Sequence, residues 1–296
     1  MPQGLSPEQV KRRLIVNTIV ESENCYVSAL HRLIVDFKQP LQRCSPPLLS
    51  AHKVDVMFHR VEQILQCHTI FGIALTQCVW EWDQKEMLGD VFLAAFSKNH
   101  VLEIYSDFVN NFTTAMDTAR QASASRPQLA HFLKMRQVYS SDRLGFYGLM
   151  VKPVQRFPQF ILLLQDLLAN TPSEHQDRLS LELALTQLEC LAEALNERKR
   201  ICEQNQAARE LAKSLGSAKI GSKGAEQLLV RQDDASQLEM DSTGLVVKTK
   251  GRRLLMLSDT LVCASGDGKN NVKWSVPVVE VSVSSFMLAA PTASTG

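Results

Sequence analysis

The sequence has almost no excess charge, no paired set of cysteines and no long apolar run. Its 32 basic and 31 acidic side chains leave a net charge of +1, so no global charge favours nucleic acid or an anionic membrane. Seven scattered cysteines, an odd number, favour free thiols in a reducing compartment. No stretch predicts a membrane span or a signal segment. We expect a soluble, cytoplasmic protein with one large or two ordinary domains.

Sites for covalent or metal chemistry are also lacking. Residues 216–223 are similar to a phosphate loop, but the lysine and the hydroxyl stand in the wrong order and no strand precedes them. No nucleophile elbow or dinucleotide fingerprint is present. We therefore expect no covalent catalysis, no metal and no cofactor. The following histidines and cysteines lack the spacing of metal ligands: His52, His59, Cys67, His68 and Cys78.

Helical periodicity dominates the first two thirds of the chain and predicts an elongated antiparallel all-α bundle. A Gly/Ser/Lys linker and a small antiparallel β module follow. The expected helices cover residues 7–39, 48–80, 87–121 with a break near 97–100, 128–135, 142–169 and 173–215. The expected strands cover residues 228–230, 244–248, 253–257, 260–263 and 272–274.

The chain is organised around the apolar stretch from Leu149 to Leu168, which contains two prolines. Each proline removes a backbone donor, so we expect a kink near residues 152–158. Lys152, Arg156 and Gln159 are spaced as a polar seam along this helix. A polar seam on an otherwise apolar helix needs a partner or water, so this is a central helix with one side open to something else.

Glu23 stands in the middle of an apolar helical stripe, where an unpaired carboxylate is costly. One interpretation is an internal pair with Lys152 or Arg156. The other is that the stripe reaches the surface and Glu23 meets a partner. Periodicity leaves the two interpretations level.

Asn196 lies at the edge of the apolar stripe of the last helix and precedes the basic run Arg198, Lys199, Arg200. Taken alone, Asn196 is typical of a helix-surface amide. The basic run alone is typical of a solvated face or of charges that complement the helix C-terminal half.

Three segments together resemble the Dbl-homology (DH) domain of Rho-family guanine nucleotide exchange factors. The first is Ser22 to Val27, with an acid three residues before Tyr-Val. The second is Lys-Pro-Val-Gln-Arg at 152–156, followed by Phe160 and a leucine run. The third is Asn196 with the Glu and basic residues after it. Residues 109–112 and 157–160 are most similar to the RhoA-directed Grinch-type subgroup.

The resemblance implies a helical bundle that binds both switch segments of a RhoA-like GTPase and speeds the loss of GDP. It implies a catalytic role for Glu23 at switch I and for Asn196 near switch II and the magnesium site. The GTPase-binding residues that it implies are Lys152, Gln155, Arg156, Gln159, Arg198, Lys199 and Arg200. Gln159 departs from the family, which usually has Lys or Arg at this position.

The resemblance assigns residues 8–213 to the DH domain and 228–290 to a divergent or truncated pleckstrin-homology (PH)-like module. By composition we expect residues 214–227 to be a linker and 291–296 a disordered tail. Lys248, Lys250, Arg252 and Arg253 leave a weak membrane association of this module open. Two other functions also stay open: a non-catalytic scaffold that keeps the bundle and only docks partners, and a lipid-binding adaptor led by the β module.

Overall fold

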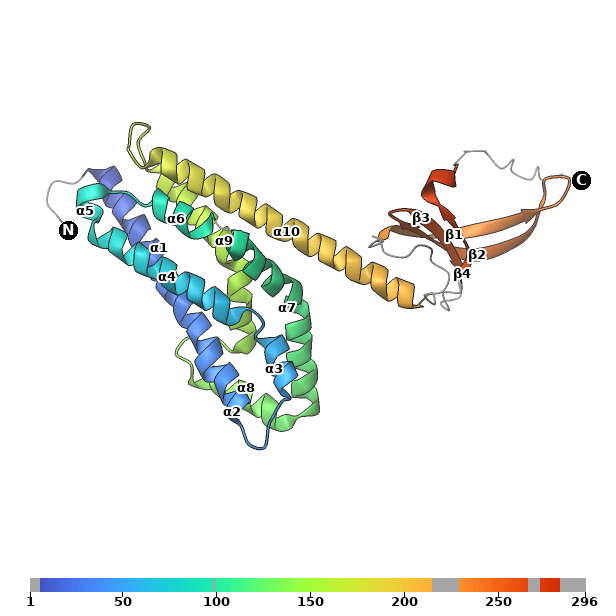
Figure 1. Cartoon of the computed structure of the whole chain (residues 1–296), viewed down its shortest axis with the longest axis horizontal. Helices are drawn as coiled ribbons and strands as arrows, with labels where there is room; N and C mark the ends of the chain where they lie inside the picture. Colours follow the sequence, from blue (N-terminus) through green and yellow to red (C-terminus); the bar gives the residue numbers. More distant parts are fainter. Residues whose placement is uncertain (1–5, 98, 215–228, 266–271, 283–296) are drawn as a thin grey trace, which may run out of the picture. The chain divides into compact units, whose positions relative to one another are not determined.

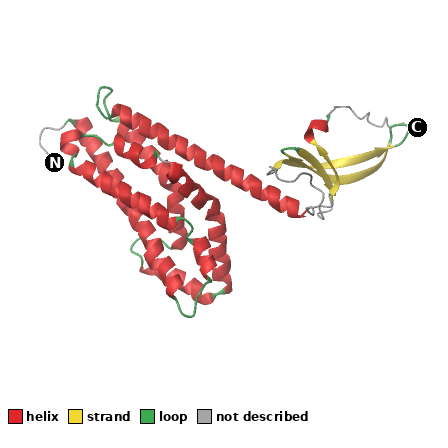
Figure 2. Cartoon of the chain, viewed as in Figure 1, coloured by secondary structure: helices red, strands yellow, loops and turns green. Residues whose placement is uncertain are grey.

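The computed structural model describes residues 6–97, 99–214, 229–265 and 272–282. It divides into two compact units, residues 1–199 and 200–296, which are treated separately below. The described part of the first unit is helical, and the second contains a four-stranded antiparallel sheet (Figures 1 and 2). The predicted fold class, an all-α bundle followed by a small β module, is confirmed.

The helices follow the predicted periodic segments, with some additional breaks. Their bounds are α1 Pro7–Arg32, α2 Gln39–Arg43, α3 Ala51–Met57, α4 Val61–Trp80, α5 Trp82–Lys85, α6 Gly89–Phe96, α7 Asn99–Ser125, α8 Pro127–Tyr139, α9 Phe146–Ala169 and α10 Arg178–Ser214. A π-helical segment, η1 Leu33–Lys38, joins α1 to α2. The predicted break near residues 97–100 is present between α6 and α7.

Two helix predictions need correction. The helical backbone does not stop before Pro40: α1 ends at Arg32, η1 continues it to Lys38, and Pro40 lies in the first turn of α2, where its missing N–H is tolerated. The expected helix over 48–80 is two helices, since Arg60 adopts a left-handed φ of 63° between α3 and α4. The central helix is present as predicted, since α9 runs from Phe146 to Ala169 with Pro153 and Pro158 inside it, and the kink expected near residues 152–158 stays a prediction.

The core of the helical unit is built around α1, which packs against α4 on one side and α9 on another. Figure 1 shows α1 and α4 side by side along much of their length. Aromatic rings from α4, α6 and α9 fill the space between these helices, and His68 lies among them. The rings of this cluster come from Phe71, Phe92, Phe96, Phe157 and Phe160.

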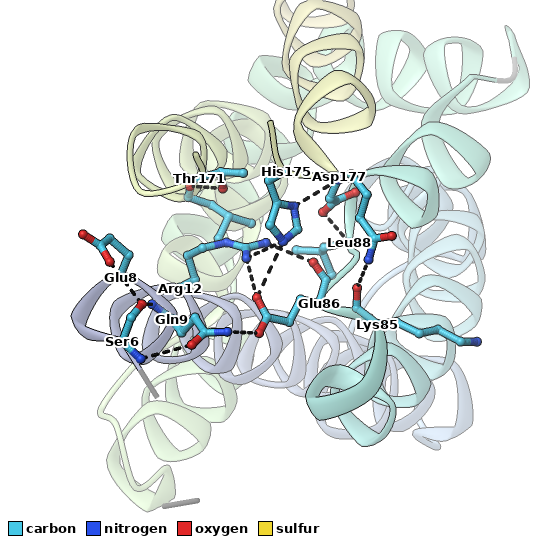
Figure 3. Close-up of polar contacts among 12 residues, drawn as sticks. Ser6, Glu8, Gln9, Arg12, Lys85, Glu86, Leu88, Thr171, His175 and Asp177 are labelled. Carbon is cyan, nitrogen blue, oxygen red and sulfur yellow. Dashed lines mark hydrogen bonds and ion pairs between the residues drawn. The ribbon is translucent and has the colours of Figure 1, made fainter. Parts of the chain in front are cut away.

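A polar cluster fastens the first turns of α1 to two distant loops (Figure 3). Arg12 is buried and its Nη1 donates to Glu86 Oε2 at 2.6 Å, while Nη2 donates to the Glu86 carbonyl at 3.0 Å. Gln9 donates to the other carboxylate oxygen of Glu86 at 2.8 Å. His175, from the loop before α10, lies 2.7 Å from Arg12 Nη1. The burial of Arg12 is therefore balanced by partners from both loops.

Asp177 extends the same cluster to the start of α6. Its carboxylate is buried and accepts from the backbone N–H of Leu88 at 2.7 Å and of Gly89 at 3.0 Å, so it caps α6 from the loop before α10. Burial raises the pKa of Asp177 to about 6, although these N–H groups and Arg12 act in the opposite direction.

The sheet is a meander of four antiparallel strands in the order β1-β2-β3-β4. The strands are β1 Leu229–Met240, β2 Val246–Leu257, β3 Thr260–Ser265 and β4 Val272–Pro277. The strands expected at 244–248 and 253–257 are therefore one strand, β2. The predicted turn at Ser258-Asp259 connects β2 to β3. The small core of the sheet comes from Leu255, Leu257, Val262 and Ala264. The expected linker, the turn at 266–268 and the tail at 291–296 lie outside the described residues.

Basic side chains of β2 are paired across the sheet with polar side chains of β1. Lys250 forms an ion pair with Glu239. Arg253 Nε lies 3.2 Å from an oxygen of Asp234, and Arg252 donates to Gln237 at 2.8 Å. Three of the four basic residues that suggested a lipid site therefore already have partners within the sheet.

Gly89 provides a direct test of the contact between α6 and α10. A Cβ at this position would lie 2.5 Å from the carbonyl carbon of Ser180 and 2.6 Å from the amide nitrogen of Leu181. Because backbone cannot move aside cheaply, Gly89→Ala should lower the free energy of unfolding by about 1–3 kcal/mol in urea titrations. Gly72→Ala is the matched control, since its Cβ would lie 3.7 Å from Glu23 Cγ and should stabilise α4 by up to about 1 kcal/mol. If the two substitutions changed the free energy of unfolding equally, the close packing of α6 against α10 would be contradicted.

Asp177 should make stability depend on pH. Its folded pKa of about 6 exceeds the ordinary value of 3.8, so ionisation costs more in the folded chain than in the unfolded chain. The folded chain is therefore more stable while the Asp177 carboxyl is neutral. This extra stability is complete below about pH 4 and is lost as the pH rises through about 6. It amounts to about 3 kcal/mol in all. Between about pH 7.5 and 4.5, the free energy of unfolding of the unmutated chain should rise by about 2 kcal/mol relative to Asp177→Asn. A difference that does not change with pH would show that this pKa is ordinary.

Candidate functional site

A groove of about 420 Å³ lies between α1 and α9. Lys152, Gln155 and Gln159, three of the predicted binding residues, line its α9 side, where Lys152 is half-buried and the two amides are exposed. The complete lining is Ser22, Cys25, Tyr26, Lys152, Gln155, Pro158, Gln159 and Leu162. The groove is mostly uncharged, with Lys152 as its single cation, and it presents hydroxyl and amide groups to a partner.

Arg156 lies beneath this groove and not on its surface. Its side chain is 1% exposed, so the predicted seam of Lys152, Arg156 and Gln159 is not a uniform surface stripe. Nη1 donates to Ser22 Oγ at 2.7 Å and to Gln159 Oε1 at 2.8 Å. The guanidinium also lies over the ring of Phe160, with Cζ 3.9 Å from the ring centroid. Arg156 thus holds two groove residues in place from below.

Glu23 is fully buried and is paired inside the protein. One carboxylate oxygen accepts from Arg156 Nη2, and the other lies 2.7 Å from His68 Nδ1. This is the internal pair with Arg156 that the sequence left level with a surface role. In this structure the Glu23 carboxylate is enclosed, so a direct contact with switch I would require it to leave both partners. Its connection to the groove runs through Arg156.

Two aromatic hydroxyls continue this buried network beyond His68. Tyr105 from α7 lies 2.6 Å from His68 Nε2, and its hydroxyl is 2.9 Å from that of Tyr26. Burial raises the pKa of both tyrosines well above the ordinary value, so both phenols keep their hydrogens. We did not predict His68 or Tyr105 as site residues. The pattern that singled out Glu23, a polar side chain in an apolar helical stripe, could also have identified them.

Asn196 lies on α10, exposed to solvent, directly after the buried Leu195. Arg198 is also exposed, and its Nη1 donates to Ser106 of α7 at 3.3 Å. Lys199 is half-buried and Arg200 is exposed at the next positions. The helix therefore carries an amide and then three cations within little more than one turn, and Arg198 contacts Ser106 of α7.

Two further grooves border the open side of α1. The one toward α4 is apolar and includes the exposed side chains of Ile73 and Trp80. The other is polar and shares Cys25 and Lys152 with the α1–α9 groove. On α1, the three grooves are lined by residues between Ser22 and Arg32, so the exposed side is hollowed in the C-terminal half of this helix.

The described residues contain no group of three His, Cys, Asp or Glu side chains placed to hold a metal ion. Within the same part of the chain, no helix is long and apolar enough to cross a membrane. What the arrangement offers is a surface of fixed donors and acceptors over a buried ion pair. Such a surface can bind and reshape a partner without covalent chemistry.

Comparison with known proteins identifies this architecture. The RhoGEF domain family matches residues 15–196, and a PH domain family matches residues 217–295. Rho guanine nucleotide exchange factor 10 from Mus musculus is 47% identical over 96% of this chain, and the Mus musculus Rho guanine nucleotide exchange factor 10-like protein is 52% identical over 90%. These matches cover 22% and 21% of the relatives, so the chain spans about a fifth of their length.

Solved structures share the fold. The DH/PH domains of PDZ-RhoGEF, in complex with GTP-γ-S activated RhoA, match with a TM-score of 0.76 at 16% identity, covering 91% of this chain and 78% of that one. The DH/PH domains of p115-RhoGEF match with a TM-score of 0.73 at 19% identity, covering 91% and 75%. The resemblance to a DH domain followed by a PH domain is confirmed.

The buried pair should be strongly coupled. Glu23→Gln leaves Arg156 as a buried cation without its anion, and Arg156→Met leaves the Glu23 anion with His68 alone. Each single change should lower the free energy of unfolding by about 3–5 kcal/mol, and the double variant should lose much less than the sum. Urea unfolding of the four proteins measures this cycle. Additive losses would contradict a direct ion pair between the two side chains.

Proposed function

Because the chain belongs to the RhoGEF domain family of Rho guanine nucleotide exchange factors, we propose that it promotes release of GDP from a Rho-family GTPase, with a RhoA-like partner preferred. The proposal extends to the site: the α1–α9 groove and the exposed part of α10 near Asn196 receive the GTPase. No cofactor and no covalent step are needed. Three of the solved neighbours are complexes of DH/PH domains with RhoA, two of them of PDZ-RhoGEF, which supports this choice of partner.

The groove between α1 and α9 is the observation that carries the proposal. Its α9 side carries the exposed amides of Gln155 and Gln159, and the second is anchored to buried Arg156. Preorganised donors and acceptors bind a partner without the entropy cost of ordering loose side chains. A groove with such anchoring fits one defined conformation of a GTPase switch segment.

The mechanism follows from linkage between two binding equilibria. A GTPase that holds nucleotide with nanomolar to picomolar affinity has about 12–16 kcal/mol of binding free energy to be weakened. A surface that binds loaded and empty GTPase equally well changes nothing. Only preferential binding of the empty state lowers nucleotide affinity, and the effect is reciprocal. The groove must therefore fit switch segments as they stand when GDP and magnesium are absent.

Glu23 and Asn196 take different parts in this proposal. Asn196 is exposed, and it supports a switch II conformation incompatible with magnesium. Glu23 is enclosed, so its part is to hold Arg156, and through it Ser22 and Gln159, in the geometry that receives switch I. This makes Glu23 a positioning residue.

The preference for a RhoA-like partner rests on Lys152 and on the cations at 198–200. Charge pairing at the edge of an interface mainly tunes encounter and partner choice. Arg198 is held by Ser106, so its charge stands at a defined position on α10. We propose that the protein acts in the cytoplasm, with the PH domain as its contact to membrane or cytoskeleton.

A non-catalytic scaffold is the competing proposal, and Gln159 is the feature that favours it. The family usually has a cation at this position, whereas Gln159 can donate to a partner but cannot form an ion pair with it. A scaffold would bind GTPases without regard to their nucleotide state. Affinities for GDP-bound and nucleotide-free RhoA, measured side by side, separate the two proposals.

Exchange should depend on Asn196. With fluorescent GDP on RhoA-, Rac- and Cdc-type GTPases, the unmutated chain should speed release most on RhoA, and Asn196→Ala should slow that release by roughly tenfold. The free energy of unfolding should change by less than about 0.5 kcal/mol, because the side chain is exposed. Gln128→Ala, an exposed amide of α8 outside all three grooves, is the control and should leave release unchanged. If the three proteins released GDP at equal rates, Asn196 would not be part of the site.

A further inference from the structure

The buried network behind the α1–α9 groove reaches two helices that contribute nothing to its lining. His68 comes from α4 and Tyr105 from α7; both are fully enclosed and neither borders the groove. Two polar side chains in an aromatic core require hydrogen-bond partners, and each has one on both sides. Phenylalanine or leucine would fill the same space with less polar burial, so packing alone does not account for these residues.

The chemistry of the groups sets the direction of the hydrogen bonds. An ionised carboxylate can only accept, so His68 Nδ1 carries a hydrogen and donates to Glu23 at 2.7 Å. Tyr105 engages the other ring nitrogen, Nε2, and thereby fixes the rotation of the imidazole. The ring is also stacked on Phe160, with an interplanar angle of 10° and centroids 6.3 Å apart. His68 therefore has one defined orientation toward Glu23.

The contacts of Glu23 with Arg156, and of Arg156 with Gln159, connect His68 to the groove. With one carboxylate oxygen held by His68, the other is directed at Arg156 Nη2. The guanidinium is planar, so fixing Nη2 also fixes Nη1, which donates to Gln159 Oε1 at 2.8 Å. Since the oxygen of Gln159 is engaged from below, its NH₂ group is the part left for a partner. A lysine at 159 could not accept from Arg156 in this way.

We propose that His68 and Tyr105 are positioning residues for the exchange reaction, and that they act through Glu23 and Arg156 to turn the Gln159 amide with its NH₂ group toward the GTPase. The group recognised is a hydrogen-bond acceptor, a backbone carbonyl or carboxylate of the displaced switch segment. This inference rests on the proposed exchange function. It also makes the glutamine at 159 a working part of the site, in place of the cation usual in the family.

Two replacements of His68 separate positioning from packing. In His68→Asn the short amide can keep the donor to Glu23 that Nδ1 supplies. In His68→Gln the longer amide reaches toward Tyr105, and the donor to Glu23 is lost. Both remove the ring, so both should lose similar stability in urea. GDP release from RhoA should fall roughly tenfold in His68→Gln and much less in His68→Asn.

A second pair of variants tests the outer end of the network. Tyr105→Phe removes the hydroxyl next to His68. The control is Tyr147→Phe, which removes a tyrosine hydroxyl of α9 that lies outside this network and outside the three grooves. Release should slow several-fold in Tyr105→Phe and stay near the unmutated rate in Tyr147→Phe.

Epistasis with Gln159 decides whether the effect runs through that amide. In a Gln159→Ala background, His68→Gln should cause no further loss of exchange, whereas a general structural defect would add to the loss. The side-chain NH₂ signals of Gln159, identified in ¹⁵N spectra by their absence in Gln159→Ala, provide a readout without any GTPase. They should shift in His68→Gln and stay in place in His68→Asn.

The outcomes are distinct. If the unmutated chain releases GDP but the losses add, or the Gln159 signals do not respond to His68→Gln, the positioning role is overturned and the exchange function stands. If the unmutated chain releases no GDP, the exchange function fails, and so does the role of His68 and Tyr105 in it. The signals then show only whether the network orders Gln159.

Discussion

The buried ion pair between Glu23 and Arg156 is the interaction on which the rest of the helical unit depends. It joins α1 to α9, and His68 and Tyr105 extend it into α4 and α7. Removing two charges from water costs several kcal/mol each, and apolar residues of the same size could pack this core at least as well. What the pair supplies is a fixed rotational setting of α1 against α9, because ion-pair geometry tolerates less slippage than packed methyl groups do.

The helical architecture was predictable because its signals are local. Apolar periodicity located the long segments, and the break near residues 97–100 was found correctly. The errors occurred where tertiary structure overrides local preference. Pro40 continues a helix because it falls where no N–H is required, and a left-handed Arg60 divides α3 from α4. In β2, residues 249–252 stand between two expected strands, but pairing with β1 keeps them within one continuous strand.

The site was predictable only in part, for a similar reason. The seam on α9 and the outlying carboxylate of Glu23 were visible in the periodicity, and the family resemblance linked them. The periodicity did not show which of these side chains face outward, because Lys152, Arg156 and Gln159 share a helical face and yet differ in exposure. His68 was considered only as a metal ligand and dismissed on spacing. Its partners, Glu23 and Tyr105, are 45 and 37 residues away in sequence, a distance that helical periodicity does not span.

The side-chain pairs between β1 and β2 affect how strongly this sheet can bind an anion. Lys250 and Arg253 each already face a carboxylate, and Arg252 faces an amide. A phosphate approaching this edge would have to displace a resident partner before it gained one of its own. Anion recognition at these positions is therefore an exchange of one counter-ion for another, and its net free energy is the small difference between two similar interactions.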